Sequence, residues 1–211
     1  MIGTSLQAVA LLVSAAVVSI GPHPTASCNQ VPLGLDQVVP GPPDNPMTRA
    51  KVELGRSLFF DERLSRNRTI SCASCHDPER AFTDGQPVAV GIHGRRGTRN
   101  SPTVLNRAYS AFQFWDGRRT SLEEQTLDSI QNPLEMDLSI GELERRLRAD
   151  AFYNTQFESV FGNRPDAASA VNAITTFVRM LLSGNSAFDR FTHGDRRALS
   201  AVARRGLSVF R

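Results

Sequence analysis

Cysteine is scarce in this sequence: the 211 residues contain three, Cys28, Cys72 and Cys75. Only the last two are paired as Cys-x-x-Cys, so the chain lacks the second pair that would complete a zinc site. Aromatic residues make up 7% of the chain, and no run of basic residues is interleaved with them. Because nucleic-acid interfaces usually carry such runs, the sequence offers little support for nucleic-acid binding.

Two other patterns are missing. The chain shows no alternating apolar and polar pattern long enough to predict a β-strand, and it contains no internal repeat. The formal net charge of +3 is small and argues only weakly for an anionic partner. With 40% hydrophobic and 21% charged residues, the composition is that of an ordinary soluble globular protein. A chain of this length fits one domain with a small appendage.

The N-terminal residues are typical of an export signal. Residues 8–20 are almost entirely apolar, a stretch too short for a comfortable membrane span but suited to a signal-peptide core. Small residues follow up to Ser27, which predicts a signal peptide over 1–27 and a periplasmic protein. No Lys or Arg precedes Arg49, so an uncleaved anchor or a misplaced start remains an alternative. A lipid anchor on Cys28 is a weaker alternative, because Thr25 stands where an acylation signal usually has an aliphatic residue.

The remainder divides into an arm, a loop-rich region and a helical region. Residues 28–46 are rich in proline and predict an irregular arm, and Asn45 and Pro46 resemble a helix start. That helix runs to Phe60. Residues 61–118 have little periodicity, and so long a loop within a domain is usually functional. A bound apolar cofactor would replace the missing protein core there.

Helical periodicity dominates after residue 118, and the predicted fold class is therefore all-α. Capping boxes predict two helix starts, and a third helix begins at an aspartate and ends at a glycine. The longest apolar face lies on a fourth helix, and a fifth closes the chain. These five signals are Thr120 with Glu123, Ser139 with Glu142, Asp150 to Gly162, residues 166–182, and a start at Asp195.

The chemistry concentrates in Cys72, Cys75 and His76. Two thiols at this spacing can add to the two vinyl groups of one haem, and the adjacent imidazole can bind the iron. A thioredoxin-like redox pair and half a zinc site are the alternatives. The redox pair needs a strand followed by a helix, which the sequence does not predict. We therefore expect one covalently attached haem c, formed outside the cytoplasm.

An ordered set of short motifs surrounds the haem motif. Together they resemble the N-terminal half of the bacterial di-haem cytochrome c peroxidases and their methylamine-utilisation relatives, over residues 47–211. The resemblance implies a cytochrome c-like all-α haem domain with long irregular loops around the haem. The motifs lie at 54–61, 81–85, 99–103, 114–118, 124–125 and 132–136.

The resemblance also implies site residues. Glu135 matches the catalytic glutamate that moves protons as the peroxide bond breaks, and Gln125 matches the glutamine beside it. Trp115 matches the tryptophan between the two haems. Without the resemblance, Glu135 would be assigned as an exposed acid at a helix flank and Trp115 as a core aromatic. A distal carboxyl is suited to acid–base work on peroxide.

Two further matches concern metals. Asn100 matches an asparagine that helps hold calcium. His93 lies one position out of register with a distal histidine of the family that binds iron. Its alternative is a solvated loop histidine between Gly91 and Gly94.

The C-terminal residues 206–211 resemble the start of the family's second haem domain, and no second Cys-x-x-Cys-His is present. We therefore expect residues 47–205 to form the peroxidatic haem domain, as a fragment or a truncated product. The implied function is reduction of hydrogen peroxide to water with electrons from a small cytochrome c or a cupredoxin. A homodimer, or a chain that carries the second haem, is a further expected partner. The alternative is a mono-haem electron carrier or an inactive haem-binding fragment, with Met136 or Met180 as a sixth ligand.

Overall fold

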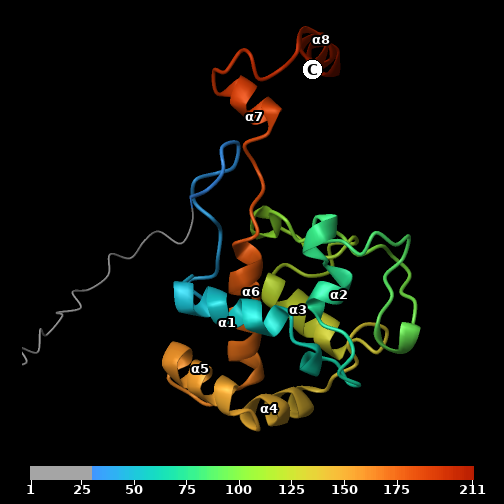
Figure 1. Ribbon diagram of the computed structural model, residues 1–211, viewed down its shortest axis with the longest axis vertical. Helices are drawn as coiled ribbons and strands as arrows, with labels where there is room; N and C mark the ends of the chain where they lie inside the picture. The colour runs from blue at the N-terminus through green and yellow to red at the C-terminus, as the bar shows by residue number, and fades with distance from the viewer. Residues whose placement is uncertain (1–29) are drawn as a thin grey trace, which may run out of the picture.

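The computed structural model describes residues 30–211, so the predicted signal peptide and Cys28 lie outside the described residues. Within 30–211 the chain forms helices and isolated bridges but no β-strand, which confirms the all-α prediction. Figure 1 shows a helical body with two further helices at one end of the molecule. The helices are α1 (Arg49–Phe59), α2 (Cys72–Cys75), α3 (Leu122–Gln131), α4 (Ile140–Arg148), α5 (Ala151–Phe161), α6 (Ala167–Arg179), α7 (Ala187–Thr192) and α8 (Ala201–Phe210).

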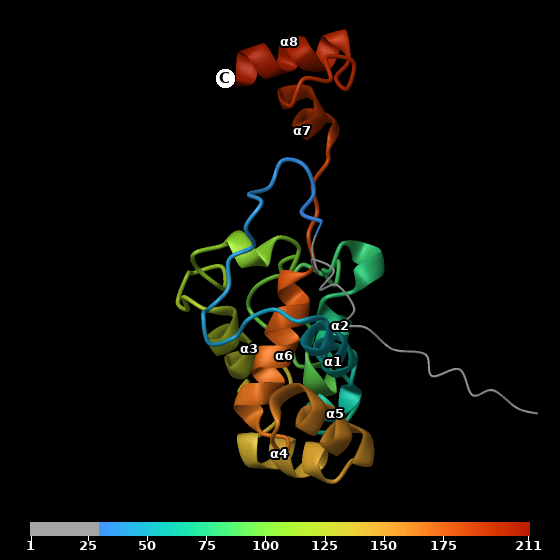
Figure 2. The same cartoon turned by 90° about the vertical axis from the view of Figure 1, so that its left-hand side faces the viewer.

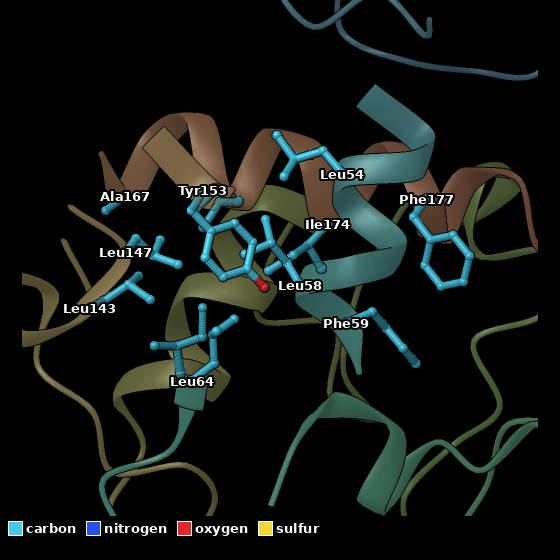
Figure 3. Close-up of a cluster of buried hydrophobic side chains, with 14 of the residues drawn as sticks. Leu54, Leu58, Phe59, Leu64, Leu143, Leu147, Tyr153, Ala167, Ile174 and Phe177 are labelled. Carbon is cyan, nitrogen blue, oxygen red and sulfur yellow. The ribbon is translucent and has the colours of Figure 1, made fainter. Parts of the chain in front are cut away.

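Helix α6 is the centre of the body. Its residues from Ala170 to Arg179 are almost all buried, and α1 crosses it at close range. The crossing is close because Gly55 of α1 has no side chain: a Cβ there would lie 1.9 Å from the carbonyl oxygen of Ala173. Figure 3 shows how α1, α5 and α6 contribute to one apolar core. Its largest fully buried members include Leu54, Leu58, Phe59, Leu64, Leu143, Leu147, Tyr153, Phe157 and Ile174.

Four predicted helix ends are confirmed. Asp150 caps α5 by accepting a hydrogen bond from the Tyr153 amide, and Gly162 ends that helix at a φ of 71°. Such a left-handed terminus favours glycine. Ser139 caps α4 by accepting from the Glu142 amide, and Asp166 caps α6. The predicted capping box at Ser139 is not completed, because the Glu142 carboxylate accepts from Arg145 and Arg146 instead.

Other helix starts differ from the prediction. Helix α1 begins at Arg49 behind Thr48, because Asn45 is buried (1% exposed) and its side chain serves tertiary contacts instead. Its Oδ1 accepts a hydrogen bond from Lys51 Nζ at 3.1 Å. In α3 the capping residue is Ser121, one position after the predicted one, and it accepts from the Glu124 amide.

The C-terminal part contains one helix more than the sequence predicted. The short α7 was not predicted, and α8 begins at Ala201 behind Ser200 rather than at Asp195. Figures 1 and 2 show α7 and α8 projecting from the helical body. The Pro-rich arm runs beside the segment that leads to α7, where the Asn185 amide donates to the Leu33 carbonyl at 2.7 Å. In the described part of the chain, no helix has the length and apolar character needed to cross a membrane.

The region between α1 and α3 is loop-rich, as predicted. It contains α2 and four single 3₁₀ turns, and three isolated bridges close its loops. Because it supplies little apolar core of its own, it leaves a cavity against α3 and α6. The turns are η1 (Glu62–Leu64), η2 (Pro78–Arg80), η3 (Ile92–Gly94) and η4 (Arg107–Tyr109).

Candidate haem site

Helix α2 is a single turn that presents the two thiols. The Ser71 amide donates to Ser74 Oγ at 2.9 Å, and the His76 amide donates to the Cys72 carbonyl at 3.0 Å, which fixes both ends of the turn. Residues three apart lie on one helix face, so Cys72 and Cys75 point the same way. Both side chains line a cavity together with His76.

The imidazole of His76 is held in the form that binds iron. Its Nδ1 lies 3.1 Å from the carbonyl oxygen of Phe82, which only accepts hydrogen bonds, so Nδ1 carries the proton and Nε2 keeps its lone pair. Burial lowers the pKa of His76, although the carbonyl groups of Phe82 and Pro102 act against it. A neutral imidazole oriented by a hydrogen bond to a backbone carbonyl is the usual metal-ligand arrangement.

The two thiols are not poised for redox chemistry. Burial raises the pKa of Cys72 to about 12 and that of Cys75 to about 11, and the carboxylate of Glu135 adds to both shifts. Reactive redox cysteines have lowered pKa values instead. The environment therefore opposes the thioredoxin-like alternative and is compatible with thiols that become thioethers.

The walls of the cavity fit a haem. They combine apolar side chains from α1, α3 and α6 with polar groups from the loop-rich region, as an apolar macrocycle with charged edges requires. The donor set of two thiols and one oriented imidazole matches covalent attachment and axial ligation. The apolar wall consists of Phe59, Ile70, Val104, Leu122, Ile130, Leu134, Met136, Ile174 and Val178.

Glu135 lies in the turn after α3 and lines the same cavity. Its Oε1 accepts a hydrogen bond from Asn132 Nδ2 at 2.7 Å, and its backbone carbonyl accepts from the Ile92 amide at 2.8 Å. Gly91 permits this approach, since a Cβ there would lie 2.1 Å from the Leu134 carbonyl oxygen. The carboxylate is half-buried and oriented, unlike an exposed acid at a helix flank.

Gln125 lies in α3 and lines the same cavity as Glu135. Its Nε2 donates to Ser129 Oγ at 3.0 Å, and Ser129 also lines the cavity. This contact fixes the amide group, so the cavity is bordered by a carboxylate and a carboxamide.

Trp115 is 63% exposed at the edge of the cavity, so it is not a core aromatic. Its Nε1 donates to the backbone carbonyl of Asn100 at 2.9 Å. Asn100 Nδ2 in turn donates to the Gln86 carbonyl at 2.6 Å. The two residues therefore hold one another at the rim, and calcium binding by Asn100 remains a prediction.

Comparison with known proteins decides the family. Residues 49–197 match the di-haem cytochrome c peroxidase family. The chain belongs to this family. It is 38% identical over 173 residues to the methylamine utilization protein MauG of Methylophilus methylotrophus, covering 82% of this chain and 52% of that protein. It is also 38% identical over 168 residues to the cytochrome c551 peroxidase of Pseudomonas aeruginosa, covering 78% and 49%.

Two solved structures give the same fold. A MauG-like protein associated with microbial copper homeostasis aligns with a TM-score of 0.76 at 35% identity, over 84% of this chain and 54% of that one. The diheme peroxidase BthA from Burkholderia thailandensis aligns with a TM-score of 0.67 at 28% identity, over 84% and 49%. The chain therefore spans about half the length of the relatives it matches.

His93 stands apart from the other predicted residues of this family member. It is exposed, adopts a φ of 55° in η3, and does not line the cavity. Its Nδ1 lies 3.5 Å from Asn67 Nδ2. Over residues 30–211, no group of three His, Cys, Asp or Glu side chains gathers to hold a metal ion. The structure thus brings all the predicted site residues except His93 to one cavity.

Several cavity residues were not predicted from the sequence. Asn132 orients Glu135, and three arginines, Arg99, Arg107 and Arg118, line the cavity. Arg118 stacks over the ring of Phe114, with Cζ 3.3 Å from the ring centroid. Arginine is too frequent here to stand out by itself, although Arg99 and Arg118 belong to two of the motifs that indicated the family.

Proposed function

We propose that this chain is the peroxidatic haem domain of a cytochrome c peroxidase, which reduces hydrogen peroxide to water. The observation that carries the proposal is one cavity lined by the haem-attachment residues, by Glu135 as the acid–base group and by Gln125. An electron carrier has no need of that pair. The family membership and the names of the relatives support the same activity.

Haem bound by Cys72, Cys75 and His76 supplies an iron that exchanges electrons with peroxide. The protein's own part is proton transfer and orientation. Glu135 moves a proton between the two oxygens of peroxide, and such acid–base catalysis contributes about 100- to 10,000-fold. Asn132 holds the carboxylate in place through its 2.7 Å hydrogen bond, and Gln125 borders the same space. The apolar wall keeps bulk water away from the reacting oxygens.

The wider assignments follow from this function. We propose that residues 1–27 direct export to the periplasm, that residues 47–205 form the haem domain, and that residues 206–211 begin the connection to a second haem domain. The electron donor is a small cytochrome c or a cupredoxin. Electrons from a second haem pass to the site through Trp115. Calcium binds at Asn100 between the two haem domains.

One observation favours a second candidate function, a mono-haem electron carrier. Met136 is buried and lines the cavity, so its thioether is available as a sixth iron ligand. A methionine-ligated iron has no open position for peroxide. The two functions therefore differ in a single measurable reaction.

Stopped-flow absorption spectroscopy of the full chain distinguishes them. The protein is expressed with a c-type maturation system, purified with haem attached, and mixed with one equivalent of hydrogen peroxide. We expect a rapid change of the haem spectrum, first order in peroxide. A spectrum that peroxide leaves unchanged would reject the peroxidatic function and favour the electron carrier.

A further inference from the structure

Three arginines, Arg99, Arg107 and Arg118, line the cavity, and their partners differ. Arg99 Nη1 pairs with Asp116 Oδ2 at 2.7 Å, and Arg118 Nη1 pairs with Asp116 Oδ1 at 2.9 Å. Arg107 has no carboxylate partner among residues 30–211. Arg107 is therefore the one of these three cavity-lining arginines that lacks a counter-charge within the described residues.

The orientation of Arg107 is fixed by neutral groups. Its Nε and Nη2 donate to Gln113 Oε1 at 3.2 and 2.8 Å, and Nη2 also donates to the Phe112 carbonyl at 2.9 Å. Within the described part of the chain Nη1 makes no hydrogen bond, so its two N–H groups remain available. The guanidinium is held on one side and free on the other.

Gln113 is a rigid support for this arrangement. It is 3% exposed, its amide donates to the Arg119 carbonyl at 2.8 Å, and its Nε2 donates to the Ser110 carbonyl at 3.1 Å. Both the oxygen and the nitrogen of this buried carboxamide are hydrogen-bonded, so the side chain keeps one orientation. Arg107 therefore keeps its position before any ligand arrives.

Burial makes the missing counter-charge costly. Arg107 is half-buried, and burial lowers the pKa of its guanidinium with no opposing effect from a nearby acid. A partly buried cation is stabilised when an anion completes its environment. By contrast, the charges that act on Cys75 are the carboxylates of Asp84 and Glu135, so the thiol end of the cavity is acidic.

We infer that Arg107 binds a carboxylate side chain of the haem, with Gln113 as its positioning residue; the inference rests on the proposed haem function. Haem carries its two propionate groups on the edge away from the vinyl groups that the thiols take. Arginine can bind a carboxylate through two parallel N–H groups, which fixes the plane of the haem as well as its charge. The haem is therefore held at four points: two thioethers, one imidazole and the guanidinium.

The test is a redox titration of the haem-loaded full chain between pH 5 and 9, since the ionisation of a propionate changes the midpoint potential of the iron. An adjacent arginine lowers a carboxyl pKa by about 1 to 3. In Arg107→Gln we expect the pH-dependent change of the midpoint potential to occur about 1 to 3 pH units higher than in wild type. We also expect a lower midpoint potential at neutral pH. Arg107→Lys keeps the charge but not the fork geometry, and we expect an intermediate position.

Arg164→Gln is the matched control, because Arg164 is exposed and does not line the cavity. Covalent haem is measured in every variant by its pyridine haemochrome. If Arg107→Gln retains haem and the pH dependence of its midpoint potential equals that of wild type, this inference is overturned while the haem site stands. Wild-type protein without covalent haem would overturn the haem site itself. If Arg107→Gln loses haem, recovery by Arg107→Lys supports the inference, and loss in both variants contradicts it.

Discussion

At the scale of single residues, the carboxylate of Glu135 is the most informative feature. Glu135 accepts a hydrogen bond from Asn132, and its backbone is fixed by the Ile92 amide at a point where Gly91 leaves no room for a side chain. Two independent contacts thus hold the carboxylate at the cavity. A group held in this way loses little freedom when substrate binds, which is a requirement for efficient proton transfer.

We expect Glu135→Gln to slow the reaction with peroxide by about 100- to 10,000-fold, because an amide cannot exchange the proton. The haem spectrum of the resting protein should change little, since the substitution preserves size and the Asn132 contact. Stopped-flow rates measure the effect. Glu158→Gln, on the exposed side of α5, is the control and should react at the wild-type rate. An unaltered rate in Glu135→Gln would exclude Glu135 from the chemistry.

The sequence identifies site residues to different degrees. Cys72, Cys75 and His76 are recognisable from spacing alone, because their chemistry is local. Glu135 and Gln125 were indicated only through resemblance to a family, since nothing local distinguishes them from surface residues. Arg107 was not indicated, because its character depends on what the fold places around it.

At the scale of elements, the packing of α1 against α6 is the main contact within the helical body. The two helices approach closely at Gly55, which faces the Ala173 carbonyl. α6 also provides Ile174 and Val178 to the cavity wall, and α1 provides Phe59. The spacing of these two helices therefore affects the width of the haem site.

We expect Gly55→Ala to destabilise the fold by about 1 to 3 kcal/mol, because the added methyl group overlaps the Ala173 carbonyl. Urea unfolding followed by circular dichroism measures the free energy of unfolding. Gly141→Ala in α4 is the control, since no atom lies within 4 Å of the added group there. Equal stability of the two variants would contradict the close packing described above.

A second contact joins α3 to α6. Arg179 Nη1 and Nη2 donate to the two oxygens of Glu123 at 2.8 and 2.9 Å, and the Thr175 hydroxyl donates to Oε1 at 2.8 Å. Burial by itself would raise the pKa of Glu123, but the Arg179 and Thr175 contacts outweigh burial and lower it below the ordinary value of 4.5. The pair therefore stabilises the fold above pH 4.5, and this contribution is lost as the pH falls through the lowered pKa.

We expect Glu123→Gln to cost about 3 kcal/mol of unfolding free energy at pH 7, because it leaves the buried Arg179 without its partner. The difference from wild type should narrow as the pH drops below 4.5, where Glu123 becomes protonated in the unfolded chain first. Urea midpoints measured from pH 7 to pH 3 test this. Glu124→Gln on the same helix is the control, and a pH-independent difference for Glu123→Gln would contradict the account.

Element boundaries could be predicted where the signal is local. Asp150, Gly162, Asp166 and Ser139 cap their helices as expected, because a cap needs only neighbouring amides. The start of α1 could not be predicted, since the side chain of Asn45 contacts residues of α6 far along the chain. The loop-rich region was recognisable only as a region without periodicity, and its shape depends on the cavity it surrounds.

At the scale of the whole molecule, the proposed reaction needs more electrons than one haem supplies. Reduction of peroxide to water takes two electrons, and one ferric haem iron provides one of them. The 211 residues contain one Cys-x-x-Cys-His motif. In isolation, this chain should therefore react with peroxide once but sustain little oxidation of reduced cytochrome c, with Trp115 oxidised at the cavity edge. Steady-state assays and peptide mass spectrometry of the same sample check both points, and sustained rapid turnover would contradict them.

The central claim is that Cys72 and Cys75 hold a haem in this cavity with His76 as its ligand. Peptide mass spectrometry of the chain, expressed with a c-type maturation system and washed with acidified acetone, tests it most directly. We predict that the peptide containing residues 72–76 carries the mass of one haem, and that Cys72→Ala with Cys75→Ala abolishes this adduct. An unmodified peptide with both thiols free, or haem that acidified acetone extracts completely, would contradict the claim.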